Sequence, residues 1–255
     1  MPKIAERIER LKQTISSVCA RSSRDPHSVK LVIVTKSASL EAVKEVIRLG
    51  CTDLAENRVQ QLKKVSLQIA EFLDAHSRRE ASCGDNVHSP RGEAAGLPKQ
   101  VNWHMVGHLQ RNKVRQVMPI VSFIHSVDTL RLAEEINTSA AKLKLCPKVL
   151  LQINTSNEPQ KYGVPTGAAI HLAEQIETLP NLKLCGLMTM APLTRNSDLV
   201  RECFVRAREL FIEMRGEKIV GPQFIELSMG MSSDYQIAIE EGATILRIGS
   251  AIFAG

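Results

Sequence analysis

Eight short apolar runs, separated by turns and by segments of helical periodicity, constrain the fold of this 255-residue sequence more than any other feature. Strands that alternate with helices are typical of parallel β-α-β units. Eight such units in about 250 residues are typical of a closed barrel. The sequence therefore predicts one α/β domain over residues 1–255 with the (β/α)8 TIM-barrel fold. The runs lie at residues 31–35, 53–57, 101–106, 123–127, 149–153, 182–190, 224–229 and 244–248.

A doubly wound open sheet is the alternative arrangement of the same units. That fold usually carries a glycine-rich turn after its first strand, where the backbone approaches a dinucleotide. Residues 34–39 read Val-Thr-Lys-Ser-Ala-Ser and contain no glycine. The closed barrel is therefore the preferred prediction.

Two segments stand outside the repeated unit. Residues 76–100 are polar, rich in glycine and proline, and without periodicity, so we expect a flexible loop inserted between the second helix and the third strand. Before the first strand, five apolar residues recur at three- and four-residue spacing and predict an additional N-terminal helix that covers one side of the barrel. These residues are Ile4, Ile8, Leu11, Ile15 and Val18.

The chain is moderately basic. Lys and Arg number 33 against 27 Asp and Glu, which gives a formal net charge of +6. The basic residues are scattered, and an aromatic content of 4% is too low for a base-stacking platform, so no nucleic-acid partner is expected. An excess of basic over acidic residues does suit an anionic small ligand such as a phosphate ester.

The six cysteines are widely spaced and form no Cys-x-x-Cys pair, which argues against a metal site and against a disulfide framework. Reduced thiols of this kind are typical of an intracellular protein. Glu6 and Glu9 argue against a secretory signal, and no run approaches the ~18 apolar residues that a membrane span needs. We therefore expect a cytoplasmic protein without a membrane partner; a mitochondrial pool is the alternative location.

Lys36 stands directly after the apolar residues of the first run. Barrels of this type hold their active sites at the C-terminal ends of the strands. We expect a lysine placed there to be partly buried, which lowers the pKa of its amine and allows it to form a Schiff base with an aldehyde. The alternative is that the side chain only extends into water.

Two turns near the C-terminus combine glycine with hydroxyl side chains. Residues 227–234 read Leu-Ser-Met-Gly-Met-Ser-Ser-Asp and lead into a helix expected at 235–241, and residues 246–250 read Leu-Arg-Ile-Gly-Ser. Backbone amides at a helix start, with serine hydroxyls beside them, bind anions. Each motif alone also fits an ordinary cap or turn. Two such turns after the seventh and eighth strands form the recurrent phosphate site of this barrel.

An amine on the first strand and a phosphate site on the last two strands together specify a ligand with an aldehyde and a phosphate. Pyridoxal 5'-phosphate (PLP) is the common cofactor that carries both groups. The residues therefore point to PLP, bound through Lys36.

Several segments resemble the pyridoxal phosphate homeostasis protein family, and the likeness runs through nearly the whole chain. The segment Trp-His-Met-Val-Gly-His-Leu-Gln-Arg-Asn-Lys is the most specific of them. The resemblance implies a barrel like the N-terminal domain of alanine racemase, with Lys36 as the Schiff-base lysine. The similar segments are residues 34–36, 55–60, 103–113, 125–128 and 186–190, with the turns that contain Ser228 and Arg247.

The resemblance also implies the other residues that bind the cofactor. It places the phosphate on Ser228, Gly249 and Ser250, and it places Asn57 and Met229 along the pocket.

By the same resemblance, Arg247 faces the pyridine nitrogen of the cofactor. A guanidinium keeps its charge and therefore disfavours protonation of the ring. Carbanion chemistry gains most from a protonated ring held by a carboxylate, and no such partner is evident. The sequence ends at Gly255, so we expect no second domain of the kind that supplies a further acid or base in alanine racemase.

These features favour a protein that holds PLP as a lysine aldimine, supplies it to apo-enzymes and serves intracellular vitamin B6 homeostasis without efficient catalysis. If this is correct, we expect no catalytic residue. The expected partners are PLP and apo forms of PLP enzymes. The expected oligomeric state is a monomer or a weak dimer. The alternative is a PLP-dependent amino-acid racemase or lyase. A third class is a barrel that binds a sugar phosphate without Schiff-base chemistry.

His104 and His108 invite a catalytic reading, because imidazole titrates near neutrality. His104 lies within an apolar run and is expected to be a core histidine whose hydrogen bonds are satisfied. His108 begins a polar stretch that we expect to shape the barrel mouth. Trp103 and Tyr162 are expected to serve in packing.

Overall fold

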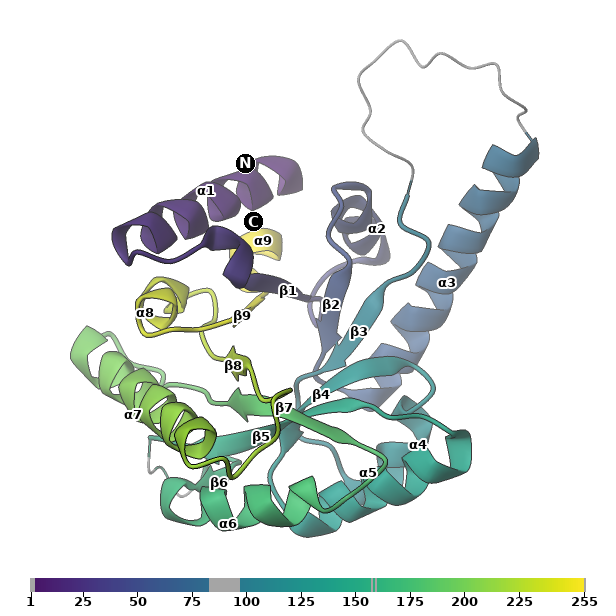
Figure 1. Ribbon diagram of the computed structural model, residues 1–255. Helices are drawn as coiled ribbons and strands as arrows, with labels where there is room; N and C mark the ends of the chain where they lie inside the picture. Colours follow the sequence, from purple (N-terminus) through teal and green to yellow (C-terminus); the bar gives the residue numbers. More distant parts are fainter. Residues whose placement is uncertain (1–2, 83–96, 157, 159, 255) are drawn as a thin grey trace.

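Eight parallel strands form a closed barrel in the part of the chain that the computed structural model describes, residues 3–82, 97–156, 158 and 160–254 (Figure 1). Their order around the barrel is β4-β3-β2-β1-β9-β8-β7-β5, and pairing between β4 and β5 closes it. The predicted barrel is therefore confirmed. The strands are β1 (Lys30–Val34), β2 (Asp53–Glu56), β3 (Asn102–Met105), β4 (Val121–Val127), β5 (Lys148–Asn154), β7 (Lys183–Met188), β8 (Glu226–Ser228) and β9 (Ile245–Ile248).

The helices surround the barrel, as Figure 1 shows. Several begin at a side-chain cap: Ser39 accepts a hydrogen bond from the amide of Ala42, and Thr129 accepts one from the amide of Leu132. They are α2 (Leu40–Arg48), α3 (Val59–Ser82), α4 (Val114–Val117), α5 (Leu130–Leu143), α6 (Thr166–Glu177), α7 (Ser197–Gly216), α8 (Tyr235–Glu240) and α9 (Ser250–Phe253). A two-residue strand, β6 (Val164–Pro165), pairs with β5 outside the barrel.

The predicted N-terminal helix, α1 (Ile4–Arg21), is present and joins the two ends of the described chain. Its apolar stripe is buried, and the helix packs against α8 and α9. The Arg7 guanidinium donates hydrogen bonds of 2.9 Å to the carbonyl oxygens of Ile252 and Ala254. Figure 1 shows α1 beside α9, close to the C-terminus.

The segment expected to be a loop from residue 76 begins as helix, since α3 continues to Ser82. Residues 77–82 contain arginine, glutamate and alanine and no glycine or proline, so nothing stops the helix before Gly84. The loop prediction was therefore wrong for its first residues. Residues 83–96 lie outside the described part of the chain, and their flexibility stays a prediction.

Apolar side chains form two layers. The larger lies between the barrel and the helices and includes Ile33 and Leu54. The smaller consists of residues on the opposite face of the strands, because side chains alternate along a strand, and it fills part of the barrel interior. Its buried members are Val32, Ala55, Phe123, Leu150, Cys185, Met188 and Ile245. Among the described helices, none is both long enough and apolar enough to cross a membrane.

Candidate functional site

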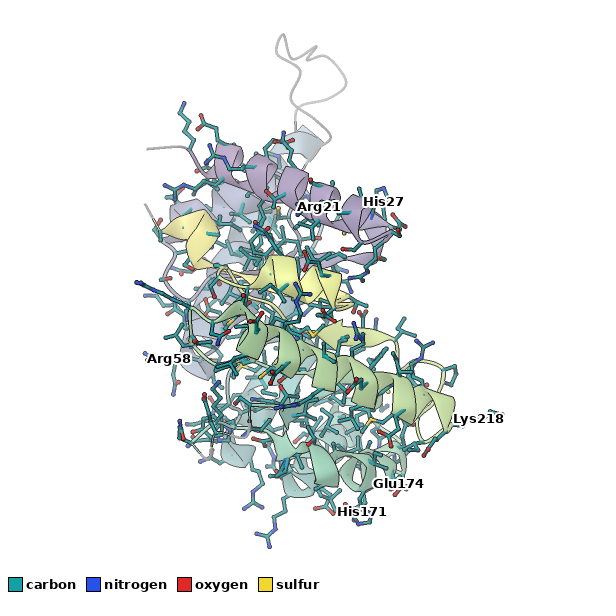
Figure 2. The ribbon with its side chains drawn as sticks, turned by 90° about the vertical axis from the view of Figure 1, so that its left-hand side faces the viewer. Arg21, His27, Arg58, His171, Glu174 and Lys218 are labelled. Atoms are coloured by element: carbon teal, nitrogen blue, oxygen red, sulfur yellow. The ribbon has the colours of Figure 1, made fainter. Side chains whose placement is uncertain are left out.

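A cavity of about 800 Å³ opens at the end of the barrel where the strands finish. Segments that follow β1, β2, β3, β5, β7, β8 and β9 line it. Figure 2 shows the barrel from the side, with the ends of the strands towards the left. Arg58, just after β2, projects at the left edge, whereas His27 and Lys218, which precede β1 and β8, lie towards the right. The cavity therefore occupies the face on which barrels of this type hold their ligands.

Five of the seven residues predicted to bind a cofactor line this one cavity. The register explains why, because β1 lies between β2 and β9 in the barrel. The segments that follow these three strands therefore meet at the same place. The five residues are Lys36, Asn57, Arg247, Gly249 and Ser250.

Lys36 lies two residues beyond β1, in the turn that leads to α2. Its side chain lines the cavity, yet the residue is exposed, so the expectation that Lys36 is partly buried was wrong. The strand ends at Val34, which places the lysine above the rim of the packed barrel rather than within it. An open position leaves the amine accessible to an aldehyde in the cavity.

A buried carboxyl group lies next to this lysine. Glu56 is fully buried, and its Oε1 atom accepts a hydrogen bond of 2.5 Å from the Thr35 hydroxyl. No hydrogen-bond partner for its Oε2 atom is present among the described residues. Burial raises the pKa of Glu56, while the Thr35 hydrogen bond and the charge of Lys36 oppose the rise. Sequence reasoning did not single out this residue.

The turns after β8 and β9 line the cavity and contain backbone amides without an acceptor in the described chain. The amides of Ser232, Ser233 and Gly249 have no backbone or side-chain acceptor within the described chain, and all three residues line the cavity. The Ser232 hydroxyl accepts a hydrogen bond of 3.1 Å from the amide of Ala251, which ties the two turns together. Such a group of amides and hydroxyls is suited to an anion.

Glycine at position 249 allows two chain segments to approach closely. A Cβ atom built there would lie 2.9 Å from the carbonyl oxygen of Val34. Any side chain at 249 would therefore push the turn after β9 away from the end of β1, which carries Lys36 two residues later. This close approach keeps the amine and the amide-rich turns in the same cavity.

Arg247 forms part of the cavity wall and is 4% exposed. Its guanidinium donates one hydrogen bond of 2.7 Å to the Ser228 hydroxyl and one of 2.8 Å to the carbonyl oxygen of Thr189. Burial lowers the pKa of Arg247 to about 10, and the charge of Asp234 opposes this fall, so the side chain stays cationic near neutral pH. Among the described residues, no carboxylate oxygen lies within 4.0 Å of the guanidinium.

Ser228 and Met229 do not line the cavity. Ser228 is the last residue of β8; it is fully buried, and its hydroxyl accepts the hydrogen bond from Arg247. Met229 is fully buried in the larger apolar layer. The expected roles of Ser228 in phosphate binding and of Met229 in the pocket therefore conflict with the geometry. The serines that reach the cavity are Ser232 and Ser233, four and five residues further along the same motif.

An aromatic pair that the sequence analysis did not predict lies at the rim. The rings of His108 and Tyr162 stack with centroids 4.1 Å apart and an angle of 13° between their planes. Tyr162 is 56% exposed and lines the cavity, so its expected role in packing was wrong. The two residues are distant in sequence, and only the fold brings them together. Trp103, by contrast, is buried in the core as expected.

Replacing Gly107 by alanine is expected to lower the free energy of unfolding by about 1–3 kcal/mol, the usual cost of overpacking. A Cβ atom there would lie 2.1 Å from the carbonyl oxygen of Asn57, so Asn57 must move within the cavity wall. The control is Gly167→Ala in α6, where no atom lies within 4 Å and a gain of about 0.5–1 kcal/mol is expected. Denaturant unfolding measures both; equal stability of the two variants would contradict the close contact.

The fold and the site define a barrel of the alanine racemase N-terminal domain type, and the family model of that description matches residues 7–255. The pyridoxal phosphate homeostasis protein of Aquifex aeolicus is 36% identical over 248 residues, which cover 97% of this chain and 96% of the relative. The protein of the same name from Escherichia coli K12 is 32% identical over 255 residues, covering 99% of this chain and 97% of that protein. The chain belongs to the pyridoxal phosphate homeostasis protein family.

Solved structures agree with this assignment. The structure of PipY from Synechococcus elongatus, with PLP bound, has a TM-score of 0.77 and is 30% identical in sequence. The match covers 98% of this chain and 100% of the PipY chain. An alanine racemase of Clostridium difficile has a TM-score of 0.67 at 12% identity, with the match covering 95% of this chain and 55% of the racemase. The second similarity shows the fold alone.

Proposed function

We propose that this protein binds PLP as a Schiff base on Lys36, keeps the reactive cofactor in its barrel and supplies it to apo-enzymes, without efficient catalysis of its own. One observation carries the proposal: the accessible amine of Lys36 shares a single cavity with the amide-rich turns after β8 and β9. The names of the relatives and the PLP in the PipY structure support the choice of cofactor.

The residues of the cavity fit the three chemical parts of PLP. The Lys36 amine would condense with the aldehyde, with loss of one water molecule. The amides of Ser232, Ser233 and Gly249, with the neighbouring Ser250, would hold the phosphate. PLP supplies an electron sink when it is bound to an amine.

The remaining predicted contacts follow the same wall. Asn57 lines the cavity between Lys36 and the turn at Gly107, and we propose that it contacts the ring of the cofactor. Arg247 would face the ring nitrogen, where a carboxylate would be needed to keep that nitrogen protonated. A cationic guanidinium cannot accept a hydrogen bond from a protonated ring nitrogen, so the nitrogen would stay unprotonated and the electron sink weak. This arrangement favours holding the cofactor over turning over a substrate.

Loaded protein is expected to protect PLP from a phosphatase and still restore the activity of an aminotransferase from which PLP has been removed. Equimolar free PLP, treated with the same phosphatase, loses its phosphate and restores less activity. The measurement is recovered aminotransferase activity against time with phosphatase present. Lys36→Ala, loaded by incubation, is the matched control; it lacks the covalent attachment and is expected to protect PLP less than the wild type does. Equal recovery from loaded protein and from free PLP would contradict a role in holding and supplying the cofactor.

A further inference from the structure

An unbroken line of hydrogen bonds crosses the interior of the barrel below the cavity. It begins at Arg247, whose guanidinium lies 2.7 Å from the Ser228 hydroxyl. The Ser228 hydroxyl lies 3.0 Å from Nδ1 of His125, and Nε2 of His125 lies 2.9 Å from Nδ1 of His104. The line ends where Nε2 of His104 lies 3.1 Å from Oδ1 of Asp53.

When both imidazoles are neutral, the two ends of this line set the direction of every hydrogen bond in it. A guanidinium can only donate, and a carboxylate can only accept. The Ser228 hydroxyl therefore accepts from Arg247 and donates to Nδ1 of His125. His125 then donates from Nε2 to Nδ1 of His104, and His104 donates from Nε2 to Asp53. These directions correspond to two neutral imidazoles that each carry their proton on Nε2.

The surroundings of the line agree with this assignment. Ser228 and His125 are fully buried, and His104 is 1% exposed. Burial lowers the pKa of His125 well below its usual value, and positive charge on His104, Arg247 and Lys30 acts in the same direction, so His125 is the ring that stays neutral. Burial would raise the pKa of Asp53, but the hydrogen bond from His104 and the charge of Lys30 outweigh it, so the pKa of Asp53 is lowered.

The two ends of the line lie at different ends of the barrel. Asp53 is the first residue of β2, and its side chain is 23% exposed. Arg247 is part of the cavity wall at the end where the strands finish. The line thus connects a carboxylate, through a series of hydrogen bonds, to a buried cation that has no ion pair within 4.0 Å among the described residues. Polarised chains of this kind stabilise a charge in a low-dielectric interior.

We propose that Asp53, His104, His125 and Ser228 are positioning residues for Arg247, and that they couple the charge at the start of β2 to the cofactor cavity. The line fixes one guanidinium nitrogen at Ser228, and the carbonyl oxygen of Thr189 fixes the other, so the guanidinium is held in one orientation in the cavity wall. The effect on PLP rests on the proposed function, whereas the hydrogen-bond direction is a property of the protein alone.

The first test reads the imidazole nitrogens of the unloaded protein by ¹⁵N nuclear magnetic resonance between pH 5.5 and 8.5. His125 is expected to show a protonated Nε2 and an unprotonated Nδ1 across this range, and the neutral form of His104 is expected to show the same pattern. The groups that face the line are Lys30 from β1, Asn102 from β3 and Asp234 beside Arg247. A proton on Nδ1 of either neutral ring, or titration of His125 within the range, would overturn the proposal whether or not PLP binds.

The second test compares Asp53→Asn with Glu226→Gln. Asparagine can still accept the hydrogen bond from His104, so the first variant removes the charge and keeps the line. Glu226 lies at the start of β8 and also faces Lys30, at 3.7 Å, but it is not in the line, which makes it a matched control. In Asp53→Asn the ¹⁵N resonances of His125 and of the Arg247 guanidinium are expected to shift, and the shifts in Glu226→Gln are expected to be smaller.

In PLP-loaded protein, the absorbance band changes at a characteristic pH. This pH is expected to be lower in Asp53→Asn than in the wild type, because the variant loses a negative charge that stabilises cationic groups at the cavity. Glu226→Gln is expected to leave this pH closer to that of the wild type. Equal shifts in the two variants would show only a general charge effect and would overturn the coupling. If wild-type protein binds no PLP while the nitrogen pattern stands, the proposed function fails and the positioning line remains.

Discussion

Replacing Lys36 by alanine is expected to remove the covalent attachment of PLP completely. Lys36 is the lysine that lines the described cavity, and its accessible amine shares that cavity with the amide-rich turns. A surface lysine elsewhere can form a Schiff base, but no phosphate site holds the aldehyde beside it. Absorbance after loading and gel filtration measures the effect: the wild type should retain a Schiff-base band and the variant should not.

The matched control for this experiment is Lys142→Ala, at an exposed position in the last turn of α5. It removes one lysine and leaves the cavity unchanged, so its absorbance band is expected to equal that of the wild type. Retention of the band in Lys36→Ala, resistant to dialysis, would show that another amine holds the cofactor. The assignment of the Schiff base would then be wrong.

The phosphate group of PLP is expected to contribute at least a hundredfold to binding. Hydrogen bonds to a charged group contribute about 1.5–3 kcal/mol each, and two such bonds correspond to roughly 10²- to 10⁴-fold in affinity. The amides of Ser232, Ser233 and Gly249 are placed to supply them. Pyridoxal, which has no phosphate, should therefore bind much more weakly than PLP. Titration calorimetry with Lys36→Ala measures both ligands without a covalent contribution.

A variant tests where that preference arises. Gly249→Val, introduced beside Lys36→Ala, places a side chain where a Cβ atom would already lie 2.9 Å from the carbonyl oxygen of Val34. The displaced turn is expected to lose most of the preference for PLP over pyridoxal. Gly216→Ala is the control, because no atom lies within 4 Å of a Cβ atom there. Equal affinities of PLP and pyridoxal for the Lys36→Ala protein, without the second substitution, would contradict a phosphate site in these turns.

The periodicity of the sequence was sufficient to predict the barrel. Apolar runs and helical spacing depend on local packing needs, so all eight strands and the helix before them could be located. The end of α3 was missed because a polar segment without apolar spacing can still form a helix when it contains good helix formers. Where a helix ends is set by such local preferences and not by the hydrophobic pattern.

The site was only partly predictable, because position along a motif does not set the direction of a side chain. Ser228 is the last residue of β8 and points into the barrel, whereas Ser232 and Ser233 lie beyond the strand and line the cavity, although all three belong to one serine-rich motif. The line from Arg247 to Asp53 involves residues on five strands, and only the closed barrel brings them together. A sequence signal existed, since His125 is a polar residue within an apolar run, but its partners could not be read from it.

The most direct test of the Schiff base locates the attached group. Wild-type protein loaded with PLP is treated with borohydride, which reduces the C=N bond, and is then digested for peptide mass analysis. The account predicts one modified site, Lys36, in the peptide that follows β1. A modification found on any other lysine, or no modification at all, would contradict it.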